Sequence, residues 1–169
     1  PTRAAPRRQS TQSDRALSID FPLRFQAPNS PSRAANRNHQ SILINERDAA
    51  CTADINSEND FLITEGAGGF YSPLCEDGLN ADLAEKLKLP VLLVANDKLG
   101  CINHILLSLE AIAARHLTVA AVILNQCEAS SPNNESNNFE DLQEISDHYI
   151  IAIKHNTTSA PEELISRLY

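Results

Sequence analysis

The stretch L-P-V-L-L-V-A-N-D-K-L-G-C-I-N-H, residues 89–104, contains a complete strand–turn–helix pattern. Residues 91–95 are all apolar, which is typical of a strand that is buried on both faces of a parallel sheet. The polar turn N-D-K-L-G follows, and from Ile102 onward apolar residues recur at the i, i+3, i+4, i+7 spacing of an amphipathic helix. We therefore expect a buried strand that leads directly into a helix, the repeating unit of an α/β fold.

The same alternation continues on both sides of this stretch. Short apolar runs predict further strands at 61–64, 119–124 and 149–153. Helical spacing, Pro90 and a capping-box pattern predict further helices at 81–89, 139–145 and 159–168. Strands that alternate with helices indicate right-handed crossovers, and so a parallel sheet flanked by helices.

Ligands of such sheets bind at the carboxyl ends of the strands. Three segments are expected there: 65–69, 96–100 and 125–126. These segments contain the candidate functional residues.

Composition narrows the class of protein. The 169 residues include 14 basic and 22 acidic residues, a net charge of −8, and 42% are hydrophobic, which is typical of a folded domain. The acidic balance argues against nucleic acid as the main partner. No apolar run reaches the ~20 residues that span a bilayer, and no apolar leader is present, so we expect a cytoplasmic protein without a membrane partner. The four cysteines are too widely spaced for a metal or redox pair and are read as reduced thiols.

The amino-terminal part differs from the rest in charge. Residues 1–40 hold seven Arg and two Asp, a net charge of +5, together with many Pro, Ser, Asn and Gln. We expect residues 1–20 to be a basic loop or a disordered segment. An arm that binds an anionic partner is the alternative.

Glu65 is the first candidate, because it comes one residue after an apolar run and before G-A-G-G. A carboxylate there can hold Mg²⁺ on a nucleotide, and glycines let backbone N–H groups approach phosphate. The alternative is a glycine turn with a solvated Glu.

The segment from Gly100 to Asn103 opens the predicted helix, where free N–H groups attract an anion. The alternative is a glycine turn in which Asn103 only caps the helix. Asn125 ends a strand, and its amide can both donate to and accept from a purine edge. A simple strand-end turn is the alternative for Asn125.

Two of these stretches resemble one enzyme family. L-I-T-E-G-A-G-G-F-Y-S-P-L at 62–74 and the stretch at 89–104 are similar to the most distinctive internal motifs of dethiobiotin synthetase. I-L-N at 123–125 follows at the expected distance, and L-R-F-Q-A-P-N-S-P-S-R-A-A at 23–35 resembles a further segment of that family. The resemblance covers residues 21–126 well.

The resemblance implies a P-loop NTPase-like α/β fold, ATP, Mg²⁺, a homodimer and a role as a ligase in biotin biosynthesis. The substrates would be 7,8-diaminononanoate and CO₂, which ATP converts to dethiobiotin by carbamate formation, phosphorylation and ring closure. By matched position, the implied ATP-binding residues are Glu65, Gly66, Ala67, Gly68, Asn125 and Gln126. The implied substrate-binding residues, reaching across the dimer, are Gly100, Cys101 and Asn103, and the implied metal ligands are Glu65 and Asp14.

One part of the family pattern is missing. None of the five glycines is followed by Lys, so the phosphate-binding pattern G-x-x-x-x-G-K-[ST] is absent, together with its strand and the Lys–Ser pair that handles the carbamate. The chain also begins with Pro1 and has no Met. We therefore interpret residues 21–169 as an incomplete nucleotide-binding domain, truncated at its amino-terminal side, with impaired activity and no catalytic residue retained. An inactive relic of that enzyme, or a related P-loop-type ATPase that acts on another carboxylate substrate, are the alternatives.

Overall fold

The computed structural model describes residues 43–52, 62–66, 68–128, 137–159 and 161–168. Within these ranges three parallel strands form one sheet in the order β1-β2-β3. The strands are β1 (Val91–Asn96), β2 (Val119–Asn125) and β3 (Ile150–Ile153). The helices are α3 (Ile44–Thr52), α4 (Asn80–Leu87), α5 (Cys101–Ala114), α6 (Asn138–Ile145) and α7 (Glu162–Leu168).

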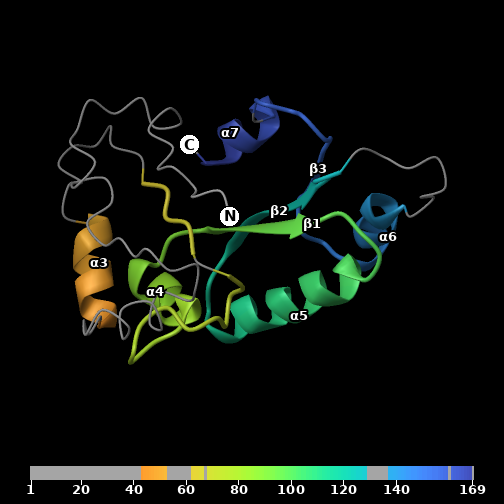
Figure 1. Cartoon of the computed structure of the whole chain (residues 1–169). Coiled ribbons are helices and arrows are strands. Elements are labelled where there is room, and N and C mark those ends of the chain that lie inside the picture. Colours follow the sequence, from red (N-terminus) through yellow and green to blue (C-terminus); the bar gives the residue numbers. More distant parts are fainter. Residues whose placement is uncertain (1–42, 53–61, 67, 129–136, 160, 169) are drawn as a thin grey trace, which may run out of the picture.

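The two faces of the sheet are covered by different helices, as Figure 1 shows. On one face α5 and α6 pack against the strands through a buried apolar cluster that includes Ile105, Leu124 and Leu142. On the other face α7 contributes Leu164, which packs against Ile123. The predicted α/β class, with a parallel sheet flanked by helices, is confirmed.

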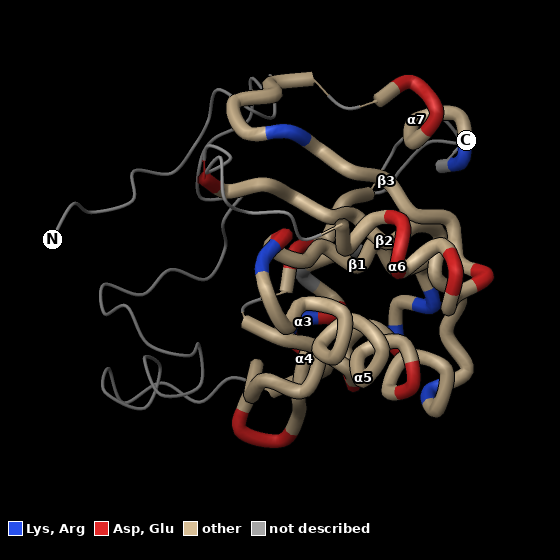
Figure 2. Tube along the Cα trace, turned by 90° about the vertical axis from the view of Figure 1, so that its right-hand side faces the viewer, with Lys and Arg blue, Asp and Glu red and all other residues tan. Residues whose placement is uncertain are grey.

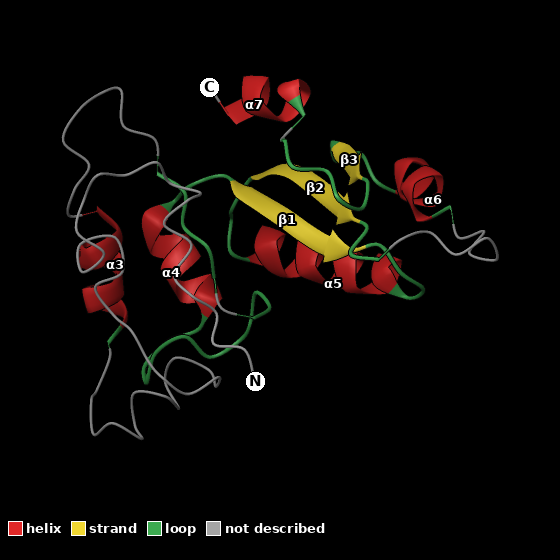
Figure 3. Ribbon diagram, turned by 45° about the horizontal axis from the view of Figure 1, so that its top comes forward, coloured by secondary structure: helices red, strands yellow, loops and turns green. Residues whose placement is uncertain are grey.

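Helices α3 and α4 lie together, away from the three strands, in both Figure 1 and Figure 3. Their shared cluster is formed by Ile44, Leu74, Cys75 and Leu83. The sequence analysis did not predict α3, because only its first turn carries strongly apolar residues and no regular apolar stripe follows. The helix is held by its partner instead: Asp77 accepts a hydrogen bond from the Ile44 N–H at 2.9 Å.

The strand predicted at 61–64 is wrong for the residues that the structure describes. Residues 62–66 form no strand, and the side chain of Ile63 is 76% exposed. A strand needs a neighbouring backbone to pair with. Within the described ranges this segment does not pair with β1, so its apolar run has no sheet to join.

Several expectations concern residues outside the described ranges. These are the basic segment 1–20, the candidate metal ligand Asp14, the motif at 23–35, and Ala67. All four described cysteines are free, as expected, and burial raises the pKa of the Cys75 thiol.

The contact between α4 and the end of α5 is electrostatic. Arg115 caps the carboxyl end of α5 and places its guanidinium 2.6 Å from Asp82 and 2.7 Å from Glu85 on α4. Asp82 also accepts the Leu79 N–H at 2.7 Å. The hydrogen bond from Leu79, and then the one from Arg115, lower the pKa of the Asp82 carboxyl below its ordinary value.

This gives a prediction for pH. A carboxyl whose pKa is lower in the folded state stabilises the protein fully above its unfolded pKa of about 3.9, and the stabilisation is lost as pH falls through the folded value. We expect Asp82→Ala to lower the free energy of unfolding at pH 7 by about 1 kcal/mol, the usual effect of losing a helix cap. The difference from wild type should shrink below about pH 4.

Urea unfolding from pH 7 to pH 2 measures this difference. Asp147→Ala is the control, because Asp147 is an exposed loop residue before β3. A difference for Asp82→Ala that stays constant over the whole pH range would contradict the assigned contacts.

Candidate functional site

The carboxyl ends of the strands lie level with one another. Asn96 pairs with Asn125, and Asn125 pairs with Ile153. The pairing continues by one residue into the loops, where Asp97 N–H donates to the Asn125 carbonyl and Gln126 N–H donates to the Ile153 carbonyl, both at 2.9 Å. The structure therefore brings two of the three predicted segments, 96–100 and 125–126, to one edge of the sheet.

The turn between β1 and α5 leaves the start of that helix open. Gly100 is the N-cap with φ 86°, a left-handed conformation that favours glycine. No side chain caps the helix, and the Cys101 N–H is bonded to the Lys98 carbonyl at 3.0 Å. The next N–H groups of the first turn have no partner within an α-helix and can bind an anion.

The three predicted substrate-binding residues present different groups. Gly100 and Asn103 are exposed. Cys101, the first residue of α5, is 2% exposed and its side chain packs in the core between α5 and the sheet, so only its backbone is available at the turn. An anion at this turn would meet backbone N–H groups and the Asn103 amide.

The predicted adenine-side residues lie at the end of β2, where Asn125 is the last residue of the strand and Gln126 follows it. The Asn125 side chain is half-buried, and its Nδ2 lies 3.7 Å from the Cys127 sulfur. The Gln126 side chain turns toward β1, where Nε2 lies 3.5 Å from Oδ2 of Asp97. Of these two side-chain amides, that of Asn125 is therefore the more available to a ligand.

A polar cluster that the sequence does not predict lies at this edge. Asn138, the first residue of α6, is 6% exposed, and its Nδ2 donates to Oδ1 of Asp97 at 2.7 Å. The same amide lies 3.5 Å from the Lys98 carbonyl. Asp97 was visible as a polar residue after a strand, but nothing in the sequence relates it to an asparagine 41 positions away.

The glycine-rich segment is held by α4 and not by the sheet. Asn80 is buried, and its Nδ2 donates to the Gly69 carbonyl at 2.8 Å. The Gly69 N–H donates to the Ser72 hydroxyl at 2.8 Å. Gly68, the residue before Gly69, has φ 85°. The expectation that this segment follows a strand is wrong for residues 62–66, as the fold already indicated.

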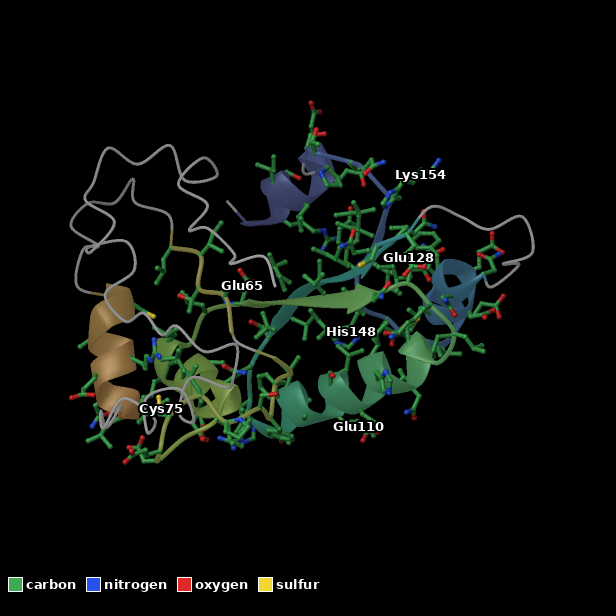
Figure 4. All side chains as sticks on the ribbon, in the orientation of Figure 1. Glu65, Cys75, Glu110, Glu128, His148 and Lys154 are labelled. Carbon is green, nitrogen blue, oxygen red and sulfur yellow. The ribbon has the colours of Figure 1, made fainter. Side chains whose placement is uncertain are left out.

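Glu65 is exposed and lies at a distance from the carboxyl edge. In Figure 4 it is well separated from Glu128, which follows β2. The described residues contain no group of three or more His, Cys, Asp or Glu side chains that could hold a metal ion. Any magnesium ion at Glu65 would therefore draw most of its ligands from phosphate and water, which is usual for this ion.

The carboxyl edge of the sheet carries positive charge, although most of the described charged residues are acidic. Acidic residues predominate along the described chain, as Figure 2 shows. Two exposed lysines nevertheless lie at the strand ends, Lys98 after β1 and Lys154 directly after β3. They supply positive charge where an anionic ligand would bind.

The glycine-rich segment yields a prediction. A Cβ atom on Gly68 would lie 2.7 Å from the Ser72 hydroxyl oxygen, and φ is in the left-handed region. We expect Gly68→Ala to lower the free energy of unfolding by about 1–2 kcal/mol, measured by urea titration.

Two matched variants separate the causes. A Cβ on Gly69 meets its nearest atom at 3.7 Å, an ordinary contact, so Gly69→Ala should change stability little. Gly100 has the same strained φ but open space around it, so Gly100→Ala should fall between the other two. Equal stability of the Gly68 and Gly69 variants would contradict the loop geometry.

Comparisons with known proteins agree with the motifs. A family profile described as AAA domain matches residues 5–159. The ATP-dependent dethiobiotin synthetase of Halalkalibacterium halodurans is 37% identical over 117 residues, 66% of this chain and 48% of that protein. That of Phenylobacterium zucineum is 42% identical over 112 residues, 62% of this chain and 45% of that protein. That of Vesicomyosocius okutanii is 30% identical over 145 residues, 86% of this chain and 63% of that protein.

The chain thus spans about half the length of the curated relatives it matches. No helix in the described ranges is both long enough and apolar enough to cross a membrane. The resemblance to dethiobiotin synthetase noted in the sequence is confirmed by these relatives. Because the profile covers most of its residues, the chain belongs to the AAA domain family, and ATP-dependent dethiobiotin synthetases are its relatives.

Proposed function

We propose that this chain acts in biotin biosynthesis, in the ATP- and Mg²⁺-dependent conversion of 7,8-diaminononanoate and CO₂ to dethiobiotin. The observation that carries the proposal is the open start of α5, which lies at the same sheet edge as Asn125. An anion site and an amide suited to a base thus occur side by side, within the stretches that resemble the synthetases.

The reaction joins a carbon atom to two amines. One amine attacks CO₂ and loses a proton, which gives a carbamate. The γ-phosphoryl group of ATP then passes to a carbamate oxygen and ADP leaves. The second amine attacks the carbamate carbon and loses a proton, phosphate departs, and a cyclic urea results.

The substrate is anchored far from the reacting atoms. Its carboxylate lies at one end of the molecule and its two amines at the other. Backbone N–H groups from Gly100 onward and the Asn103 amide would hold the carboxylate. Such remote binding positions the amines for reaction, which is a main source of rate.

ATP would lie between two parts of the chain. The Asn125 amide, with Gln126 beside it, would contact adenine, because an amide can pair with both a donor and an acceptor. Glu65, Gly66, Ala67 and Gly68 would line the triphosphate. Glu65 would hold Mg²⁺, with Asp14 as the proposed second ligand. When bound, the ion neutralises charge on the phosphates.

The sequence also limits the activity we expect. Phosphoryl transfer depends on positioning and on electrostatic stabilisation by phosphate-binding groups. These 169 residues contain no G-x-x-x-x-G-K-[ST] pattern. We therefore propose that the chain by itself binds its ligands but turns over slowly.

Assembly is the last element of the proposal. We propose a cytoplasmic homodimer in which the start of α5 serves a site completed by the partner subunit. One alternative, an inactive relic of that enzyme, would not bind the diamine. A related ATPase would bind ATP and a different carboxylate.

The decisive experiment concerns Asn103. Removing its amide should weaken diamine binding and leave ATP binding unchanged, since only the carboxylate loses a donor. A hydrogen bond to a charged group contributes about 1.5–3 kcal/mol, so Asn103→Leu should raise the Kd for 7,8-diaminononanoate about ten- to hundredfold, measured by calorimetry. His104→Leu is the matched control, because His104 is the next exposed residue of α5.

Each outcome of this experiment has a clear meaning. Equal loss of ATP and diamine affinity would show that Asn103 only caps the helix. Wild-type chain that binds ATP but not the diamine would favour a related ATPase, and binding of neither ligand would favour a relic. A monomer at assay concentration in sedimentation would contradict the dimer.

A second prediction concerns Glu65. A neutral amide is a poorer ligand for a hard dication than a carboxylate. We expect Glu65→Gln to weaken Mg²⁺-dependent ATP binding by about tenfold, a loss of about 1.4 kcal/mol, without changing the urea midpoint. Glu110→Gln on the exposed side of α5 is the control. An unchanged Mg²⁺ titration would remove Glu65 from the metal site.

A further inference from the structure

We propose that Asp97 is a positioning residue that links the two ligand-binding loops, so that ATP and the diamine bind cooperatively. The link, here called the Asp97 bridge, consists of Asp97, Gln126 and Asn138. This inference rests on the proposed function, because it assigns the loop after β1 to the diamine and the loop after β2 to ATP.

The Asp97 carboxylate divides its two oxygens between two elements. Oδ1 accepts the Asn138 amide at 2.7 Å, and Oδ2 lies 3.5 Å from the Gln126 amide. The backbone of Asp97 is fixed as well, because its N–H donates to the Asn125 carbonyl at 2.9 Å. One residue therefore contacts the ends of β1 and β2 and the start of α6.

Asn138 anchors the bridge in the core. It is 6% exposed, and its amide has two N–H groups. One donates to Asp97, and the other faces the Lys98 carbonyl at 3.5 Å. Leaving a buried polar group without its partner is costly, so this arrangement resists change.

Lys98 connects the Asp97 bridge to the start of α5, the proposed diamine-binding site. Its carbonyl also accepts the Cys101 N–H at 3.0 Å, the contact that opens α5. A shift of Asn138 or Asp97 would therefore move the first turn of α5, where the proposed carboxylate site lies. On the other side, Gln126 would move with Oδ2 of Asp97, and Gln126 neighbours the proposed adenine contact.

A cap for α6 alone would not need this geometry. The N-cap residue of α6 is Asn137, and the N–H₂ group of the Asn138 amide acts here as a donor, so it cannot accept an N–H group of the first turn. The Asn138 side chain instead faces the loop after β1. A purely structural contact would alter stability but would not alter how one ligand affects the other.

Two variants separate the two arms of the bridge. Asp97→Asn keeps one carbonyl oxygen for Asn138 but turns an amide N–H₂ toward the Gln126 amide, so the ATP side loosens. Asn138→Leu has a similar volume and removes the donor to both Oδ1 of Asp97 and the Lys98 carbonyl, so the diamine side loosens. Asp141→Asn, an exposed change on the same helix, is the matched control.

Calorimetry on the 169-residue chain measures the Kd of each ligand alone and with the other ligand saturating. We expect Asp97→Asn to raise the Kd of ATP, and Asn138→Leu that of the diamine, by about two- to thirtyfold. In wild type, saturation with one ligand should change the Kd of the other. In both variants we expect this change in Kd to fall toward a factor of one. The control should behave as wild type.

A measurement without ligand keeps the test independent of the proposed function. Backbone hydrogen exchange of residues 98–103 should become faster in Asn138→Leu and stay unchanged in Asp141→Asn. If wild-type chain binds neither ligand, the proposed function fails, and exchange alone then decides whether the bridge positions the loop. Unchanged exchange together with unchanged ligand coupling would overturn the Asp97 bridge, as would equal loss of both affinities in every variant.

Discussion

The burial of α5 against one face of the parallel strands is the contact on which the rest of the structure depends. Ile105 and Ile112 are 1% and 0% exposed, and Leu124 of β2 is fully buried. This packing fixes the direction of α5 relative to β1. The start of α5 must then lie at the carboxyl edge of the sheet, where the proposed substrate site is found.

Parallel pairing provides the second constraint. Since Asn96, Asn125 and Ile153 are level, the loops that follow the three strands begin side by side. If the polar side chains of these loops lacked complementary partners, they would repel one another or leave hydrogen-bonding groups unsatisfied. Asp97 resolves this by accepting from the Asn138 amide and by facing the Gln126 amide.

The glycine-rich segment is ordered by a different set of interactions. Its order comes from local hydrogen bonds to Ser72 and Asn80 on the α4 side, and not from strand pairing. Arg115 then connects α4 to the end of α5 through two carboxylates. The segment that follows the proposed triphosphate-binding residues is therefore held on the α4 side, and Arg115 joins that side to the end of α5.

The sequence by itself determined most of the elements, because apolar periodicity reflects burial directly. The strands at β1, β2 and β3 and the helices α4 to α7 all follow from it, and so does the family, from two short motifs. The helix α3 was not predicted, because its position depends on a hydrogen bond to Asp77, which lies far along the chain. The strand expected at 61–64 was wrong for its described part because a strand exists only through a partner. Only the tertiary structure decided which segments meet at the carboxyl edge, and only it placed the buried Asn138 against Asp97. The physical reason is that hydrogen bonds between residues far apart in the chain produce no periodic pattern in the sequence.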